Sequence, residues 1–224
     1  MMKTLHAWSI LGVALLSGCG SSVSVPPMRA AGTITGTVAL GPVAGATVTA
    51  YAGDGSAVLG VAQTDSGGHY AVTLSAPSQT VLLAATGGHY REEASGAGVQ
   101  LGASDVLYAY TPYVSGQTAV AAITPFTHLA VALARYLESQ GTPLATAAIE
   151  ANAALDRQLG FDAVATQPLD VADPMNADTQ LTPGLTYGFL LAAISQWTQQ
   201  AQPLAEPAGV TAAPFDSIDW SQQV

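Results

Sequence analysis

The sequence predicts an α+β protein of more than one domain, with a β-sandwich over residues 32–115 and a small helical bundle over 116–205. Apolar and polar residues alternate with period two from 32 to 113, which is typical of short strands that bury one face. From 119 onward the apolar residues recur at helical spacing instead. A short apolar leader precedes both segments, so the expected order is leader, strands and then helices.

The leader, residues 1–18, is typical of an export signal. Lys3 precedes an uncharged and mostly apolar run, and two small residues, Ser17 and Gly18, end it. The run covers about ten residues, or about 15 Å as a helix, whereas the hydrocarbon of a bilayer is roughly 30 Å thick. We therefore expect a signal peptide that is removed, and not a membrane-spanning helix.

Cys19 is the only cysteine and follows this leader directly. Leu16, Ser17, Gly18 and Cys19 together resemble the signal box of bacterial lipoproteins. The resemblance implies cleavage before Cys19, a diacylglyceryl thioether on its sulfur and an acyl group on the new amino end, which together anchor a protein stably. An ordinary secretory signal and a fortuitous cysteine are the alternatives.

The residues after the cysteine point to an anchored location. Gly20, in place of an aspartate, resembles the outer-membrane sorting pattern of Gram-negative lipoproteins. Residues 19–31 are mostly small, with two prolines and no periodicity, which is typical of a tether. We therefore expect a protein of the cell envelope that is lipid-anchored at the outer membrane, with the membrane as one partner.

Short runs between the tether and residue 113 predict the strands. Of the five predicted strands, the first three show alternation of apolar and polar residues, and the last two are continuously apolar. Glycine-rich turns lie between several of them. Strands of this length and spacing are typical of a sandwich or barrel. The predicted strands are 33–38, 46–51, 70–74, 81–85 and 106–110.

Two stretches within these strands, GTVALGPVAGATVTA at 36–50 and TDSGGHYAV at 64–72, resemble the carboxypeptidase regulatory-like, transthyretin-related sandwiches. In that family a T-D-x-x-G-x-[YF] turn opens a strand, and Asp65, Gly68 and Tyr70 match it. The resemblance implies a capped bend with Tyr70 pointing into the core. Such domains resemble carbohydrate-binding modules, adhesins and enzyme accessories, so the fold alone names no function.

Thr-Pro pairs begin each predicted helix, at residues 124, 142 and 182. In such a pair the threonine hydroxyl caps the helix, and the proline needs no hydrogen-bond partner at the first helical position. The helices are predicted to end near 139, 160 and 201. Their apolar stripes predict the core-facing sides: Phe126, Leu129, Leu133 and Leu137; then Leu144, Ala148, Ala151, Leu155 and Leu159; then Tyr187, Leu190, Ile194 and Trp197, with Phe189 beside them.

Two further segments, GGHYREEASG at 87–96 and ITPFTHLA at 123–130, resemble the front end of a group of larger bacterial lipoproteins. In that group the first segment follows the sandwich and the second opens the helices. The resemblance implies no activity. Where the longer proteins continue, this chain has a polar tail over 206–224, and one alternative function is therefore an accessory fragment of a larger envelope hydrolase.

The chain is acidic, with 15 aspartates and glutamates against five lysines and arginines and a net charge of −10. This balance repels nucleic acids and anionic lipid surfaces, so we expect no nucleic-acid partner. Removal of the leader takes away Lys3, the only lysine. The mature chain would then have no lysine, and therefore neither the amine for Schiff-base chemistry nor the phosphate-binding lysine of a P-loop.

Histidines supply one set of candidate metal ligands. His89 and Glu92 have the H-x-x-E spacing of zinc carboxypeptidases, but the pattern offers no clear third ligand. The sequence GGHY occurs twice, so His69 and His89 form another candidate pair. The simpler interpretation is two glycine turns with exposed histidines that lead into strands.

Carboxylates supply the other candidates. Asp170, Asp173 and Asp178 offer oxygen ligands for calcium, but they lack the spacing of a calcium loop. Paired carboxylates for glycoside hydrolysis come from distant strands, and no local pattern marks them. We therefore expect no catalytic residue, no metal and no cofactor.

Tyr108 and Tyr110 are the candidate ligand-binding residues, because they share one face of a predicted strand at period two. A tyrosine offers an apolar ring to the C–H face of a sugar and a hydroxyl to its polar rim. Packing between strands or under the helices is the alternative. The predicted function is a non-catalytic structural or binding role in the envelope, with a carbohydrate or an envelope protein as partner.

Overall fold

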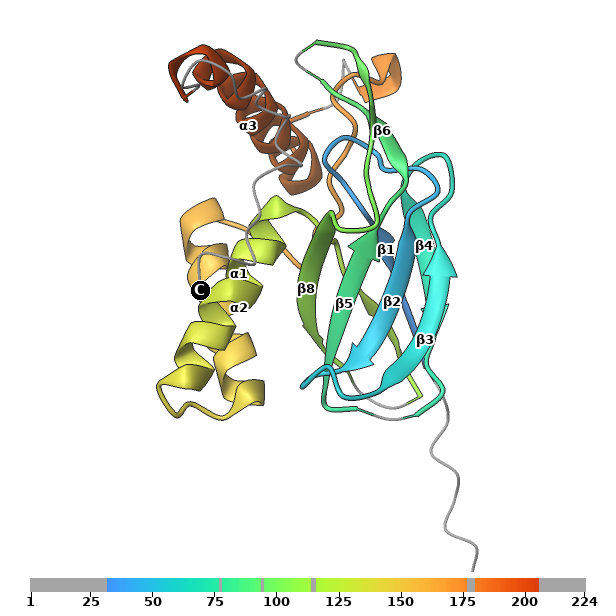
Figure 1. The fold of residues 1–224 in the computed structure, drawn as a ribbon, viewed down its shortest axis with the longest axis vertical. Coiled ribbons are helices and arrows are strands. Elements are labelled where there is room, and N and C mark those ends of the chain that lie inside the picture. Colours follow the sequence, from blue (N-terminus) through green and yellow to red (C-terminus); the bar gives the residue numbers. More distant parts are fainter. Residues whose placement is uncertain (1–31, 77, 94, 114–115, 177–179, 206–224) are drawn as a thin grey trace, which may run out of the picture.

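The computed structural model describes residues 32–205, apart from 77, 94, 114–115 and 177–179, and it has a mixed α+β fold (Figure 1). The signal peptide, Cys19, the tether up to residue 31 and the polar tail lie outside the described residues. The strands are β1 (Thr33–Thr37), β2 (Thr47–Ala52), β3 (Val58–Gln63), β4 (His69–Thr73), β5 (Thr80–Thr86), β6 (His89–Arg91), β7 (Gly98–Gln100), β8 (Val106–Pro112) and β9 (Thr118–Val120). The α-helices are α1 (Pro125–Ser139), α2 (Leu144–Leu159) and α3 (Pro183–Ala205).

Two sheets share one hydrophobic core. The first has the strand order β4-β1-β9 and the second the order β3-β2-β5-β8, while β6 and β7 form a separate two-stranded ribbon. The predicted strands correspond to β1, β2, β4, β5 and β8, and in the three that were predicted from alternation, β1, β2 and β4, the predicted inward residues are buried. The buried residues at the centre come from both sheets and include Ile34, Val48, Val72, Val81 and Leu83.

The sequence analysis gave no bounds for the other four strands within the described residues, although it offered a strand at β6 as one interpretation of the second GGHY turn. The edge strand β3 leaves Val58 and Val61 more than half exposed, so its apolar residues mark no single buried face. Strand β9 lies in the segment that was expected to be helical and pairs in parallel with β1. Strands β6, β7 and β9 have three residues each, which is too short for a period to show.

The pair α1 and α2 covers the outer side of β5 and β8. Leu82 and Tyr110 pack there against small residues of both helices. The open edge of β8 is also satisfied, because Thr127 Oγ1 donates to the carbonyl oxygen of Tyr108 and Asn152 Nδ2 donates to that of Tyr110, both at 3.1 Å. The two helices therefore extend the sheet's hydrogen bonding as well as its core.

The predicted apolar stripe of α1 is wrong at its two central leucines, whereas its outer members, Phe126 and Leu137, are partly buried and pack against the core. Leu129 and Leu133 are 42% and 37% exposed, and the buried face carries Ala130, Val131 and Ala134 instead. Small side chains allow α1 to approach both the sheet and α2, whereas the leucines of the predicted stripe would hold the helix away.

Two of the three predicted helix caps form. Thr124 Oγ1 accepts from Thr127 N at 3.2 Å, and Thr127 Oγ1 accepts in return from Thr124 N at 2.9 Å. Thr182 Oγ1 accepts from Leu185 N at 3.2 Å. The predicted cap at Thr142 is wrong, because Pro143 occupies the cap position of α2 and no side chain bonds there.

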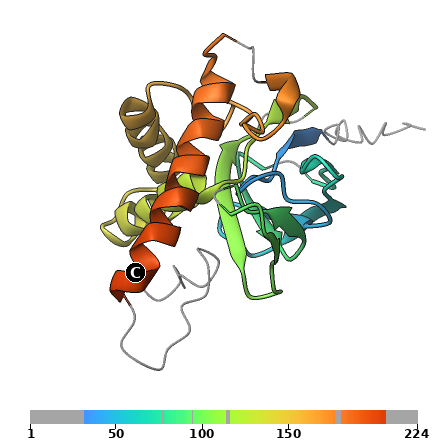
Figure 2. The same ribbon diagram turned by 90° about the horizontal axis from the view of Figure 1, so that it is seen from above.

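Helix α3 lies across one end of the molecule, over the junction between the sheets and the α1–α2 pair (Figures 1 and 2). Tyr187 is fully buried, and its hydroxyl lies 2.6 Å from Thr124 Oγ1. Phe189 and Trp197 are 54% and 67% exposed, so the predicted core-facing stripe of this helix is wrong at those positions. Among the described helices, none combines the length and apolar character needed to cross a bilayer.

Replacing Thr124 with valine should lower the free energy of unfolding by about 2 to 4 kcal/mol. The substitution removes the cap of α1, worth about 1 kcal/mol, and leaves the buried Tyr187 hydroxyl without its partner, at a cost of about 1–3 kcal/mol. Urea unfolding measures the difference. Thr142→Val is the matched control, because Thr142 also precedes a proline but caps nothing, and equal losses in the two variants would contradict this account.

Candidate functional site

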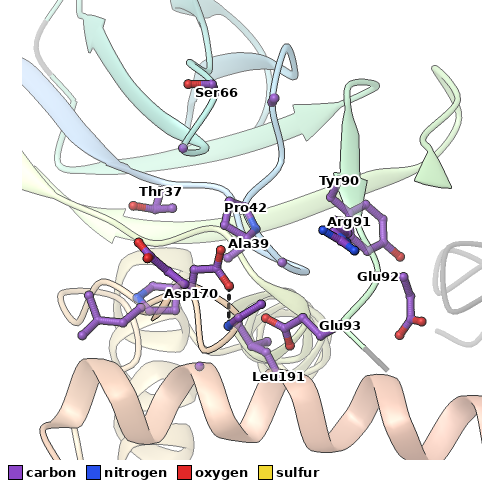
Figure 3. Close-up of a pocket in the computed structure, with 18 of the residues that line it drawn as sticks. Thr37, Ala39, Pro42, Ser66, Tyr90, Arg91, Glu92, Glu93, Asp170 and Leu191 are labelled. Carbon is purple, nitrogen blue, oxygen red and sulfur yellow. Dashed lines mark hydrogen bonds between the residues drawn. The ribbon is translucent and has the colours of Figure 1, made fainter. Parts of the chain in front are cut away.

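A groove of about 960 Å³ lies between the sheets and the C-terminal part of the chain. One wall comes from the β1–β2 loop, the β3–β4 turn and the β6 strand with the residues after it, and the other from α3 and from residues 168–176 of the connector between α2 and α3. Figure 3 shows side chains from both walls converging on the groove. Its lining combines a guanidinium, two imidazoles, carboxylates and small apolar groups, so it offers hydrogen-bond donors and acceptors together.

The β3–β4 turn shapes the sheet-side wall. Asp65 Oδ1 accepts from the backbone N–H of Gly67 and of His69, each at 2.9 Å, and these bonds lower the pKa of Asp65, chiefly the bond from His69. Gly68 has a φ of +77°, and a Cβ there would lie 2.6 Å from the Val38 carbonyl oxygen, so the turn needs glycine.

Residues after the turn complete this wall. His69 Nδ1 lies 3.0 Å from Thr37 Oγ1 at the mouth of the groove. Tyr70 is almost fully buried and donates its hydroxyl to the Ala121 carbonyl oxygen at 2.7 Å. The bend is therefore capped by Asp65 and contains a glycine with positive φ at Gly68, and Tyr70 points into the core, as the motif implies.

The connector forms the opposite wall and lies very close to α3. A Cβ on Gly188 would overlap the Leu169 carbonyl oxygen, so only glycine permits this approach. Leu169 N also donates to the Gly184 carbonyl oxygen at 3.0 Å. Next to this contact, Asp170 Oδ1 accepts from Ala172 N at 2.8 Å, which turns the connector along the groove.

Two consecutive glutamates line the groove after β6 but differ in their surroundings. Glu92 is 5% exposed, and its Oε2 accepts from Ser95 N at 2.7 Å and from Gln199 Nε2 of α3 at 2.9 Å. Glu93 is half-buried, and its Oε2 is a buried oxygen without a hydrogen-bond partner among the described residues.

The environment of Glu93 favours its protonated form. Burial, together with the negative charges of Asp170 and Glu92, raises the pKa of Glu93 to about 7, and burial is the largest of these causes. Figure 3 shows Glu93 beside Asp170, with Leu191 of α3 next to them. The groove therefore contains a carboxyl group that gains and loses its proton near neutral pH.

The groove brings together several residues that the sequence analysis considered separately. His69, His89 and Glu92 line it, as do Asp170 and Asp173. Asp173 Oδ1 accepts from Met175 N at 2.9 Å. Within the described ranges no three His, Cys, Asp or Glu side chains are arranged to hold a metal, and Asp178 lies outside those ranges.

Tyr108 and Tyr110, the candidate sugar-binding pair, lie outside the groove and pack beneath α1 and α2. Tyr110 is 3% exposed, and its burial raises the pKa of its phenol. The Arg135 guanidinium lies 5.0 Å from the centre of the Tyr108 ring, and the His128 ring lies 5.4 Å from it. Both tyrosines therefore serve in packing, and Tyr110 presents no free ring face to a ligand.

Sequence reasoning missed Glu93 as a site residue. Glu93 itself entered only through the resemblance of GGHYREEASG to larger lipoproteins, while the metal-ligand spacing in the same segment pointed to His89 and Glu92. The distinguishing features are the loss of solvent at Oε2 and the proximity of Asp170, and both depend on a connector that is distant in the sequence. The sequence signal that could have indicated a site here is a pair of adjacent glutamates directly after a short strand. That pair does not indicate which of the two is buried without a hydrogen-bond partner.

No protein-family model and no curated protein matches this chain. The chemistry of the groove must therefore be interpreted from its own residues.

Glu93→Gln should stabilise the protein at high pH and leave its stability nearly unchanged at low pH. The pKa of Glu93 is about 7 in the folded protein against an ordinary value of 4.5, so the folded state binds more protons between these values. Stability contributed by Glu93 is thus lost as pH rises through this window. The gain above about pH 7 should be about 1 kcal/mol, because partial exposure screens much of the repulsion.

Urea unfolding at several pH values measures this effect. Glu150→Gln, on the exposed side of α2, is the matched control and should show no pH-dependent gain. Parallel stability curves for wild type and Glu93→Gln would contradict the assignment of a raised pKa to Glu93.

Proposed function

We propose that this chain is a lipoprotein of the cell envelope, attached through Cys19 and oriented to the outer membrane, with a non-catalytic binding role. The leader and its Leu-Ser-Gly-Cys box support the anchor. The proposal also assigns the β-sheets to the transthyretin-like sandwiches. The capped Asp65 turn, the glycine at Gly68 and the buried Tyr70 support that assignment, as does the core shared by two sheets.

The groove, rather than the tyrosine pair, is the proposed binding site, and a neutral carbohydrate is its proposed ligand. The observation that carries this is the mixed lining of the groove: Asp170, Glu93 and His89 offer acceptors and donors at fixed positions, and Arg91 adds one cation. Hydroxyl groups both donate and accept, so a polyhydroxylated ligand suits such a lining. The acidic connector and the net charge of −10 disfavour phosphorylated ligands.

Cys19→Ser should prevent lipidation, because a thioether cannot form on a hydroxyl. The variant is expected as an uncleaved or soluble species, whereas the parent partitions into detergent. Phase separation of whole-cell extracts, followed by intact mass, measures this. Partition of the variant into detergent at the parental level would overturn the anchor.

Ala172→Trp should abolish glycan binding without unfolding the protein. Ala172 lines the groove and is exposed, so a large ring can occupy the ligand's volume without entering the core. Glycan-array binding of the soluble 32–205 region, expressed with its fold checked by circular dichroism, measures this.

The matched control for this substitution is Ala57→Trp. Ala57 is also an exposed alanine, but it lies between β2 and β3 and does not line the groove. This variant should bind as the wild type does. Absence of glycan binding in the wild type, or equal binding by all three proteins, would overturn the groove as a carbohydrate site.

A further inference from the structure

The unpartnered Oε2 of Glu93 is the feature of the groove that protein contacts do not explain. Buried polar atoms in folded proteins are almost always hydrogen-bonded, so an exception calls for a physical reason. A carboxylate with one oxygen cut off from water loses much of its hydration. Protonation removes this cost, and the half-buried Glu93 side chain still lines the groove, where a ligand can reach its carboxyl group.

The charged groups around Glu93 act mainly in the same direction. On its own segment the charged neighbours are Glu92 and Arg91, and the facing connector contributes Asp170 and Asp173. Arg91 is exposed, and its Nε donates to the Gly96 carbonyl oxygen at 3.1 Å.

The other elements at the groove place no further carboxylate in its described lining, and the Asp65 carboxylate of the β3–β4 turn is exposed and accepts from the backbone of its own turn. The titratable groups of β4 and β6 in the lining are the exposed His69 and His89 and the buried Tyr90. Helix α3 has no charged residue along its whole length. The negative groups nearest to Glu93 are therefore not offset by a buried cation in the described lining.

We propose that Glu93 recognises the ligand as a neutral carboxylic acid, donating a hydrogen bond from its carboxyl group to a hydroxyl or carbonyl oxygen of a neutral sugar. This inference rests on the proposed function of the groove and adds the residue that recognises the ligand and the condition that regulates binding. As pH rises, Glu93 loses the proton that it donates, and the ligand is released. A buried protonated carboxyl group that acts as a donor is an established use of such an environment.

A cationic ligand would behave in the opposite way. An ammonium group placed between Glu93 and Asp170 would replace the proton, so its binding would strengthen as pH rises. The neutral ligand is favoured because the pKa of Glu93 lies at about 7, so a large share of the side chain is protonated at neutral pH and can donate to a neutral acceptor without losing its proton. The direction of the pH dependence therefore distinguishes the two chemistries.

The test uses a matched pair of probes, tri-N-acetylchitotriose and its analogue with N,N,N-trimethylammonium groups in place of the acetamides, which stays cationic at every pH used. Calorimetry with the detergent-solubilised full-length protein is performed at about pH 6 and about pH 8, on either side of the Glu93 pKa of about 7. Wild type should bind the acetylated probe, with affinity falling about tenfold for each pH unit above about 7.

Variants of Glu93 distinguish a side chain that donates a hydrogen bond to the ligand from one that only lines the groove. Glu93→Gln retains a donor that cannot titrate, so it should bind the acetylated probe equally at both pH values. Glu93→Ala should lose at least about tenfold in affinity at the lower pH, which corresponds to about 1.4 kcal/mol. Glu150→Gln should behave as the wild type does. Circular dichroism checks that each variant is folded.

Several results would overturn the inference. In one such result, Ala172→Trp abolishes binding of the acetylated probe but the affinity of the wild type does not change with pH. This result would keep the groove as the binding site and reject the role of Glu93. Preferential binding of the trimethylammonium probe that strengthens with pH would replace the neutral ligand with a cationic one. Failure of wild type to bind either probe would reject the neutral-sugar form of the inference, while the glycan array decides the groove function separately.

Discussion

The buried hydrogen bond between Thr124 and Tyr187 is the contact on which the relative placement of sheets, helices and groove depends. Thr124 directly follows Ile123, whose N–H donates to the Thr37 carbonyl oxygen of β1, and its own side chain caps α1. The same oxygen meets the Tyr187 hydroxyl of α3 at 2.6 Å. One fully buried threonine therefore joins the end of a sheet, the start of one helix and the position of another.

Close packing of small residues positions the helices and the connector that form one wall of the groove. Ala130, Ala134 and Ala148 let α1 and α2 lie against the outer side of β8, where Thr127 and Asn152 complete its open edge. Gly188 lets α3 touch the connector at Leu169. The connector then faces β6, and the space between them is the groove. A larger side chain at any of these contacts would move a wall of the site.

The groove's electrostatics follow from this packing in an acidic chain that has few cations. Asp170 is brought beside Glu93 by the connector, while Glu92 is satisfied by Ser95 and Gln199. Two neighbours in sequence thus differ in chemistry, because one carboxylate receives donors and the other is deprived of water on one side. Tyr108 and Tyr110 of β8 show the opposite relation between sequence and structure. Their spacing suits sugar binding, but in the fold both side chains pack beneath the helices.

The sequence by itself determined the mixed class, the main strands and the caps at Thr124 and Thr182, because period and capping are local properties that short stretches of chain express. It also located the candidate anchor, Cys19, beyond the described residues. Only the tertiary structure decided the short strand β9, the exposure of Leu129 and Trp197, and the state of Glu93. Each of these depends on which distant segment lies opposite, and pairing, burial and loss of solvent arise only when those segments meet.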